Sequence, residues 1–217
     1  MMNKQFKLEF GKRRLETLAK ENFIDMSKDE SLWDKANDIV KECLDPVCIY
    51  SVYSDLSVED NILHIGDEFT LKSAVFSSIP KEILGQCGVF VMSVGDGSKC
   101  EGILDEGLEH MVRIAYLDAL KDLLRQEFEG DYLVGSYFAP GLGDMKVEEI
   151  QTIAKMVDFE QAGVTINDSY MMEPVKSVAG LFMFFNEVHP ESQNACTYCI
   201  NGGDSSCNLC SAGNKEK

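Results

Sequence analysis

An apolar run bounded by glycines and followed by a long one-sided helical pattern most constrains the fold of this chain. The run from Gly88 to Gly95 is short and apolar, which is typical of a buried strand. From about Gly102 to Phe128, apolar residues recur at helical spacing with charged residues between them. The apolar stripe comprises Leu104, Leu108, Met111, Ala115, Ala119 and Leu123, and the polar side comprises Glu109, Arg113, Asp118, Lys121 and Asp122. The sequence therefore predicts a body in which strands and helices are mixed.

Two more helices are predicted on either side of this pair. Ser27-Lys-Asp-Glu30 is a capping-box pattern, and the helix that it begins is expected to end near Pro46. A second helix is expected from about Lys146 to Val157, with Asp144 as its N-terminal cap. Both segments carry apolar residues at helical spacing, so each is expected to bury one face.

Strand-like segments complete the predicted body. They lie at 46–53, 132–138 and within 167–185, and a polar hairpin-like stretch lies at about 59–70. Gly180 lies inside the last of them, where a missing side chain permits a bulge or the close approach of another backbone. These elements predict an α+β fold, in which a mixed or antiparallel sheet is flanked by helices.

The length and composition set the expected domain organisation. A chain of 217 residues is long enough for one well-buried domain with a small appendage, but is short for two full domains. Past His189-Pro190 the composition changes abruptly to polar. We expect an N-terminal segment at 1–26, the body at 27–190 and a cysteine-rich tail at 191–217.

The charge and the missing targeting signals limit the partners. The chain has 20 basic and 37 acidic side chains, for a formal net charge of −17, which repels a phosphate backbone and excludes nucleic acid. No apolar run approaches the roughly 20 residues that span a bilayer. The start of the chain has no signal-peptide apolar core, so a cytoplasmic location is expected. In that reducing compartment, cysteines are thiols or metal ligands rather than disulfides.

The tail contains two C-x-x-C pairs in a stretch with almost nothing apolar. Cys196 and Cys199 are followed, after seven intervening residues, by Cys207 and Cys210. Four thiolates so spaced can hold a 4Fe–4S cluster, which we favour, or a zinc ion. Zinc ribbons usually have a longer span between the pairs, roughly 15 to 20 residues. Redox disulfides and a disordered tail are the remaining alternatives.

Two segments of the body carry a family resemblance. One is Ser136-Tyr-Phe-Ala-Pro-Gly-Leu-Gly-Asp144, with a P-G-x-G-D turn, and the other contains Met172-Glu-Pro-Val-Lys-Ser177, an M-x-P-x-K-S pattern. With the strand end at Ser93–Gly95 and the long helix after it, they resemble the activation domain of cobalamin-dependent methionine synthase. The resemblance is closest to free-standing, activation-domain-like proteins of anaerobic bacteria and spans most of residues 30–185. It implies an activation-domain-like fold.

The resemblance also implies a function. Such a domain docks over a corrinoid whose cobalt has been oxidised to inactive cob(II)alamin. An electron and a methyl group from S-adenosylmethionine then restore methylcobalamin. This chain has no cobalamin-binding D-x-H-x-x-G, because none of His64, His110 and His189 follows an Asp by two residues. The cobalamin is therefore expected on a partner, either a corrinoid protein or a cobalamin-dependent methyltransferase, with ferredoxin or flavodoxin as the low-potential electron donor.

The resemblance implies a set of docking or cofactor-binding residues and also shows where the chain departs from the family. The residues are Tyr137, Ala139, Pro140, Gly141, Gly143 and Asp144 in the turn, and Met172, Lys176 and Ser177 in the second segment. In this chain, Tyr137 and Leu142 occupy the positions of the Arg and the Tyr in the family pattern R-x-A-P-G-Y. Losing a charge-assisted contact to the ligand carboxylate predicts weak or no binding of S-adenosylmethionine.

Each of these segments also has a purely structural interpretation. The 139–143 turn is equally explained as a tight strand-to-helix connection, since short glycine motifs are weak signals. An exposed lysine such as Lys176 is most often a surface charge. The turn at Gly95–Lys99 lacks the spacing of a phosphate-binding loop and is expected to be a plain turn. No catalytic residue is assigned.

Three functions follow from these observations. The leading hypothesis is an accessory protein for reductive activation of a corrinoid-dependent methyltransferase, with the terminal cysteines as an electron relay. The second is a non-redox corrinoid-protein binding module or chaperone whose tail holds structural zinc. The third is a reactivation domain that binds S-adenosylmethionine.

Overall fold

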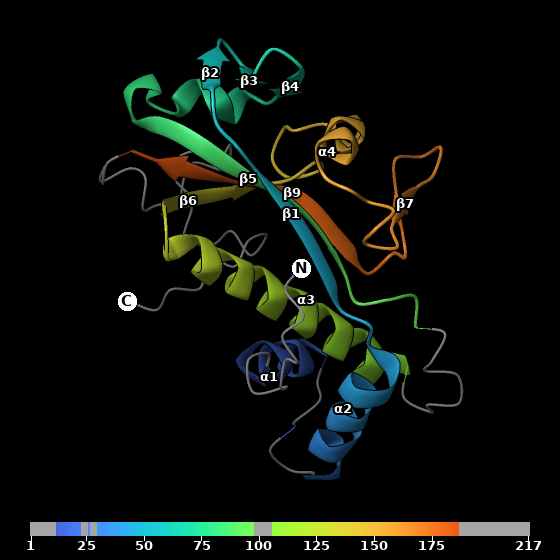
Figure 1. The fold of residues 1–217 in the computed structure, drawn as a ribbon. Helices are drawn as coiled ribbons and strands as arrows, with labels where there is room; N and C mark the ends of the chain where they lie inside the picture. Colours follow the sequence, from blue (N-terminus) through green and yellow to red (C-terminus); the bar gives the residue numbers. More distant parts are fainter. Residues whose placement is uncertain (1–11, 23–25, 27–29, 98–105, 187–217) are drawn as a thin grey trace. The chain divides into compact units, whose positions relative to one another are not determined.

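The computed structural model describes residues 12–22, 26, 30–97 and 106–186 (Figure 1). This part of the chain divides into two compact units, each made of three stretches of sequence. Unit 1 comprises the described residues within 1–49, 91–124 and 159–178, and unit 2 comprises those within 50–90, 125–158 and 179–217. The boundaries therefore fall inside continuous elements as well as between them.

The main sheet has four strands in the order β1-β5-β9-β6, so neighbours in the sheet are distant in sequence. The strands are β1 (Val47–Tyr53), β5 (Leu84–Ser93), β6 (Leu133–Phe138) and β9 (Ser177–Phe185). β6 and β9 are antiparallel, with Leu133 opposite Phe185 and Phe138 opposite Leu181. The α+β fold and the strands predicted in these regions are confirmed, and β5 begins earlier than the predicted run.

The two central strands are buried along most of their length. In β5 every residue from Cys87 to Ser93 is buried, and in β9 every residue from Ala179 to Phe185 is buried. Central strands that are covered on both faces have continuous apolar sequences, without the alternation of apolar and polar residues. This is why the run between Gly88 and Gly95 was recognisable in the sequence.

Aromatic rings form the core of unit 2. Phe90 stacks on Phe182 with ring centroids 5.4 Å apart, and Tyr132 stacks on Phe184 at 4.4 Å. Phe128, at the end of the long helix, meets Phe184 edge to face at 4.9 Å. Aromatic pairs of this geometry stabilise a core beyond their buried area, by roughly 0.5–1.5 kcal/mol each.

A three-stranded meander occupies the place of the predicted hairpin-like stretch (Figure 1). Its strands are β2 (Leu56–Glu59), β3 (Ile62–Ile65) and β4 (Phe69–Lys72), each antiparallel to the next. Val58 lies opposite Leu63, which lies opposite Leu71, and all three are buried, so one face of the meander is apolar. Two short 3₁₀ helices, Ala74–Ser78 and Lys81–Ile83, then lead into β5.

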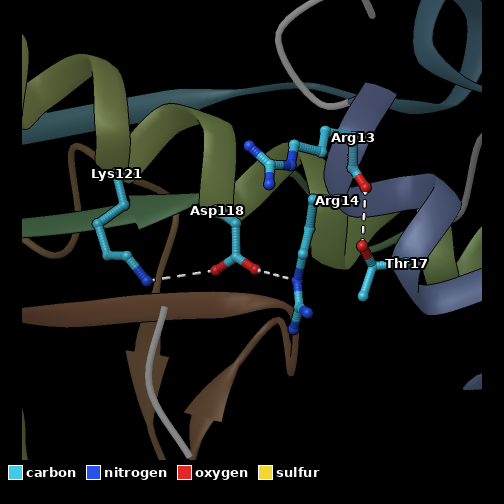
Figure 2. A network of polar contacts seen from close by, with 5 residues as sticks. All are labelled: Arg13, Arg14, Thr17, Asp118 and Lys121. Carbon is cyan, nitrogen blue, oxygen red and sulfur yellow. Dashed lines mark hydrogen bonds and ion pairs between the residues drawn. The ribbon is translucent and has the colours of Figure 1, made fainter. Parts of the chain in front are cut away.

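Unit 1 contains two N-terminal helices, α1 (Lys12–Glu21) and α2 (Glu30–Cys43), and most of the long helix α3 (Glu106–Glu129). The α2 helix and α3 were predicted, and α1 was not. Its Leu15, Leu18 and Ala19 are buried. Asp118 of α3 accepts a hydrogen bond from Arg14 Nε at 2.8 Å, which ties α1 to α3 (Figure 2). Within α3, Asp118 also accepts from Lys121 Nζ at 3.2 Å.

Burial extends farther around α3 than the predicted stripe. Val112, Tyr116 and Leu117 are buried in addition to Leu108, Met111 and Ala115. Arg113, predicted on the polar side, is only 7% exposed, so that prediction was wrong. A helix covered from more than one direction loses the one-sided pattern from which its polar face is inferred. None of the described helices is long and apolar enough to cross a membrane.

Candidate functional site

The turn after β6, in unit 2, is held by hydrogen bonds of its own backbone. Gly141 N–H donates to Met145 O at 2.9 Å, and Leu142 N–H donates to Ala139 O at 3.0 Å. Gly141 and Gly143 have φ angles of 84° and 62°, which a side chain would strain. These glycines therefore shape the turn, and the two N–H groups named here are used within it rather than offered to a ligand.

Asp144 anchors this turn to a different part of unit 2. Its Oδ1 accepts from Ser73 Oγ at 2.5 Å and its Oδ2 accepts from Ala74 N–H at 2.7 Å, where a 3₁₀ helix begins. The helix after the turn, α4 (Ile150–Met156), follows a 3₁₀ helix at Val147–Glu149 that has no side-chain cap. The prediction that Asp144 caps its own following helix was therefore wrong. It caps a helix about seventy residues earlier in the chain.

The electrostatics of Asp144 follow from these bonds. Desolvation raises the pKa of the carboxyl, but hydrogen bonds from Ser73, Ala74 and its own amide outweigh it and lower the pKa below 3.8. A carboxylate stabilised in this way is ionised at neutral pH and is already satisfied by the fold. We therefore interpret Asp144 as a residue that positions the turn.

The start of the turn packs against β9. The ring of Tyr137 lies 5.8 Å from that of Phe90 and 5.7 Å from that of Phe182, within the aromatic core of unit 2. A Cβ on Gly180 would clash with Phe138 O and would lie 2.7 Å from Tyr137 Cε2. The close approach predicted at Gly180 is confirmed. Leu142 and Val147, in contrast, are 40% and 43% exposed.

The second predicted segment lies in unit 1 and begins with a compact loop. Strands β7 (Thr165–Ile166) and β8 (Met172–Glu173) pair antiparallel, with Ile166 opposite Met172. Asn167 closes the loop, since its Oδ1 accepts from Ser169 N–H at 3.0 Å and from Met171 N–H at 3.1 Å. Met171 and Val175 are 53% and 72% exposed, so the loop presents apolar side chains to its surroundings.

The predicted pair Lys176 and Ser177 have different environments. Ser177 is buried and its Oγ donates to Pro174 O at 2.7 Å, so its hydroxyl proton is used inside the segment. Lys176 is half-buried, and its backbone oxygen accepts from Val94 N–H at 3.4 Å. Burial lowers the pKa of the Lys176 ammonium, and the charge of Arg113 lowers it further, against an opposing effect of Glu109. Lys176 is therefore influenced by a group that the sequence predicts on the polar side of a helix and at no site.

That group is Arg113, which organises the turn after β5. Its guanidinium donates to Gly95 O through Nη2, and Nη1 donates to Asp96 O at 3.4 Å and to Glu109 Oε1 at 2.9 Å. The turn at Gly95 is thus more than a plain connection. A charged residue flanked by apolar ones at Val112 and Ile114 was the sequence signal that could have indicated its burial.

The predicted metal ligands Cys196, Cys199, Cys207 and Cys210 lie outside the described residues. Among the residues that the structure describes, no three His, Cys, Asp or Glu side chains are grouped so that they could hold a metal ion. Burial raises the pKa of Cys48 and of Cys87 to about 12 each, so these two thiols remain protonated and unreactive.

The structure therefore places the predicted residues in two local sites. Residues 137–144 belong to unit 2, where Tyr137 and Ala139 lie against Gly180. Met172, Lys176 and Ser177 belong to unit 1, where Lys176 lies beside the end of β5. Both sites are organised by glycine turns at the ends of sheet strands.

Comparison with known proteins places the chain by its fold. No family model matches it, and no curated protein does. Among solved structures, it is similar to a crystal structure of the MetH reactivation domain bound to AdoHcy, with a TM-score of 0.57 and 15% sequence identity. The match covers 74% of this chain and 66% of that one, so the chain spans just under two thirds of its neighbour's length.

The fold is thus of the α+β class, with an antiparallel β6–β9 pair and flanking helices. Within that class the chain has an activation-domain-like fold, the fold of the MetH reactivation domain. The resemblance drawn from the 136–144 and 172–177 segments is confirmed at the level of the fold.

Proposed function

We propose that this chain is an accessory protein for the reductive activation of a corrinoid-dependent methyltransferase whose cobalamin is bound to a partner. The observation that carries the proposal is the fold, which is that of a MetH reactivation domain. The sequence has no D-x-H-x-x-G segment at any of its three histidines, so the proposed corrinoid belongs to another protein. In this role the chain docks on the partner and promotes one-electron reduction of cob(II)alamin to cob(I)alamin.

Exposed apolar side chains support the docking part of the proposal. Leu142 and Val147 flank the turn in unit 2, and a Cβ on Gly141 would lie 3.4 Å from Val147 Cγ1. Met171 and Val175 are exposed in unit 1. Apolar side chains that gather into an exposed patch are typical of surfaces that bind a partner.

Electron delivery would depend on the tail. Cys196, Cys199, Cys207 and Cys210 form an all-thiolate donor set, which suits a 4Fe–4S cluster or zinc. We favour the cluster, because a bound cluster supplies a one-electron carrier of low potential. Reduced ferredoxin or flavodoxin is the proposed class of electron donor.

The test is an anaerobic assay with a corrinoid protein loaded with cob(II)alamin and a low-potential reductant. The full chain is expected to accelerate the appearance of cob(I)alamin, followed by its absorbance. Leu142→Glu is expected to weaken this effect by placing a charge on the turn after β6, which is part of the proposed docking surface. Leu133→Glu is a matched control, because Leu133 is exposed to a similar degree but lies at the other end of β6.

A result with no acceleration, obtained with protein whose metal content is intact, would contradict the proposal. Metal analysis of anaerobically purified protein distinguishes the non-redox alternative. Zinc without visible absorbance would favour a corrinoid-protein binding module with a structural zinc tail.

A second candidate function is a reactivation domain that binds S-adenosylmethionine. It is favoured by one observation, the AdoHcy bound to the structural neighbour. Against it, Tyr137 stands where the family pattern has Arg, and its ring is packed in the aromatic core of unit 2. Isothermal titration with S-adenosylhomocysteine tests this candidate, and saturable micromolar binding would make it the preferred one.

A further inference from the structure

The β7–β8 hairpin, residues 165–176 of unit 1, carries the most exposed large apolar side chains of the described residues. Met171 is 53% exposed and Val175 is 72% exposed. None of the residues from 165 to 176 is buried, so the whole segment lies at the surface. A single exposed apolar side chain needs no explanation, but the two largest exposures on one short hairpin do.

The side chain of Asn167 fixes the conformation of this hairpin. Its Oδ1 accepts from Ser169 N–H at 3.0 Å and from Met171 N–H at 3.1 Å, and its Nδ2 donates to Glu173 Oε1 at 3.0 Å. The Asn167 backbone donates to Met171 O at 3.0 Å and accepts from Tyr170 N–H at 2.9 Å. Since no residue of the segment is buried, its order comes from these polar contacts rather than from packing in a core.

The backbone of the hairpin is strained at Tyr170. Its φ angle of 62° lies in the left-handed region, which a bulky residue rarely adopts. Strain of this kind persists only where the surrounding structure enforces it, and it is concentrated at functional sites. Met171 follows directly and its side chain is exposed, so burial of that side chain does not offset the strain. The hairpin is therefore ordered in a conformation that leaves apolar groups accessible.

The accessible side of the hairpin combines apolar and acidic groups. Met171, Glu173 and Val175 are exposed, whereas residues 172, 174 and 176 are half-buried, an alternation that is typical of an extended segment. Glu173 lies between the two apolar residues in sequence, and Asn167 holds its carboxylate in place. Asp168, which is also exposed, adds a second acidic group. Such a surface complements an apolar surface that has Lys and Arg at its rim.

These features favour a protein as the occupant, and one different from this chain. A segment without a buried residue offers no enclosed site to a small molecule, which binds where most of its own surface is covered. A two-fold contact between copies brings the same patch of each copy together, so Asp168 and Glu173 would face their own like charges. The net charge of −17 adds to this repulsion.

We propose that the β7–β8 hairpin docks through Met171 and Val175 onto an apolar surface, rimmed by Lys and Arg, of the corrinoid-carrying partner protein. Asp168 and Glu173 pair with that rim and select the partner by charge. Asn167 is a positioning residue, which orders the hairpin before docking and so reduces the entropy lost on binding. The identity of the partner rests on the proposed function, and the contact is with its protein surface rather than with its cobalamin.

Biolayer interferometry of the full chain against the corrinoid protein loaded with cob(II)alamin tests this contact. Met171→Glu and Val175→Glu are each expected to weaken binding by roughly tenfold or more, the usual effect of losing a central apolar residue of an interface. Leu133→Glu, which changes an exposed apolar residue of unit 2, is the matched control and is expected to leave binding unchanged. Both hairpin variants are expected to keep the melting temperature of the natural protein, because both side chains are exposed.

The double variant Asp168→Asn with Glu173→Gln tests the charge of the hairpin. Both changes keep the size of the side chain, and Gln retains an oxygen that can accept from Asn167. Binding of the natural protein is expected to weaken as salt rises, and the double variant is expected to bind more weakly and with a smaller dependence on salt. Asp67→Asn, at an exposed aspartate of unit 2, is the control. Equal or tighter binding by the double variant would overturn the proposal.

Three other results would also overturn it: no binding by the natural protein, unchanged binding by Met171→Glu and Val175→Glu, or self-association of the chain that Val175→Glu abolishes in sedimentation velocity. The last result would make a second copy the occupant. The cob(I)alamin assay separates this inference from the proposed function. Acceleration that both hairpin variants retain would leave the function without this docking site, whereas hairpin-dependent binding without acceleration would leave the docking site without the function.

Discussion

At the scale of single residues, the polar groups of this protein take their roles from partners that are distant in sequence. Asp144 accepts from Ser73 and Ala74, and Arg113 donates to the carbonyls of Gly95 and Asp96. The hydrogen bonds of each charged group hold a glycine turn in its conformation. Lys176 differs, because it lies beside one of these turns without a carboxylate partner in the described part of the chain.

Replacing Asp144 by Ala is expected to destabilise the protein at neutral pH by about 1 kcal/mol, the usual cost of losing a helix cap. Because the folded pKa of Asp144 is below 3.8, its stabilising effect is complete above that pH. The effect is lost as the pH falls through the lower folded value. Urea denaturation of both proteins at pH 7 and at about pH 3 measures this difference.

Asp67→Ala is the matched control for Asp144, since Asp67 is an exposed aspartate in a turn of the same unit. It is expected to change the free energy of unfolding by less than about 0.5 kcal/mol. Equal losses in the two variants would contradict the capping role of Asp144.

Replacing Lys176 by Gln is expected to leave stability unchanged or to raise it by up to about 1 kcal/mol, a limit that allows for solvent screening of a partly exposed group. The folded pKa of Lys176 is below 10.5, so between the folded value and 10.5 the unfolded chain binds more protons. The penalty is therefore complete below the folded pKa and disappears as the pH rises toward 10.5. Urea denaturation at pH 7 and near pH 10 measures it. A variant less stable at pH 7 would show that Lys176 is a structural residue.

At the scale of elements, β6 and β9 depend on the absence of one side chain. Gly180 lies against Phe138 O and the Tyr137 ring, and Phe138 is opposite Leu181 in the register of the two strands. The register shifts between Val134 and Tyr137, just before this contact. The turn after β6 begins directly after Phe138, so the fit at Gly180 also fixes where that turn starts.

Gly180→Ala is expected to destabilise the protein by about 3 kcal/mol, because the clashing atom at Phe138 belongs to the backbone and the added methyl forces the strands apart. Gly66→Asn is the control, since Gly66 has a φ of 57° with nothing within 4 Å of its Cβ position. Asn tolerates that conformation, so a cost below about 1 kcal/mol is expected. Chemical denaturation of the two variants gives both values. A tolerated Gly180→Ala would mean that β6 and β9 are not so closely packed.

At the scale of the whole molecule, the activation-domain-like body and the cysteine tail are proposed to have separate tasks. The described part of the body has a fold of its own, with no cluster of metal ligands within it. The four tail cysteines are the proposed metal ligands. Separate tasks mean that one can be removed while the other is kept.

A variant with Ser at positions 196, 199, 207 and 210 is expected to lose its metal, measured by elemental analysis, and to lose at least tenfold in the rate of cob(I)alamin formation. Its melting temperature is expected to stay close to that of the natural protein, since the buried core that the structure describes is built from residues between Leu15 and Phe185. Cys48→Ser is a control for general loss of thiols. Retained metal in the quadruple variant would refute the assignment of these ligands.

The sequence predicted most elements of the fold because their signals are local. The apolar run of β5, the capping-box helix α2 and the periodicity of α3 each lie within one continuous segment. Helix α1 was missed although Leu15, Leu18 and Ala19 have helical spacing, because the segment is short and strongly charged. Arg113 was placed on the wrong side of α3, since a pattern of charges does not reveal that a turn covers one of them.

By itself, the sequence determined where most of the strands, helices and glycine turns lie, and it indicated an activation-domain-like fold from two short motifs. Tertiary structure decided which polar groups meet. The pairs Asp144 with Ser73, Arg113 with Gly95, and Lys176 with Val94 join segments that are between 18 and 82 residues apart in sequence. Local spacing encodes secondary structure because backbone geometry is periodic, whereas these pairings depend on how distant segments pack together.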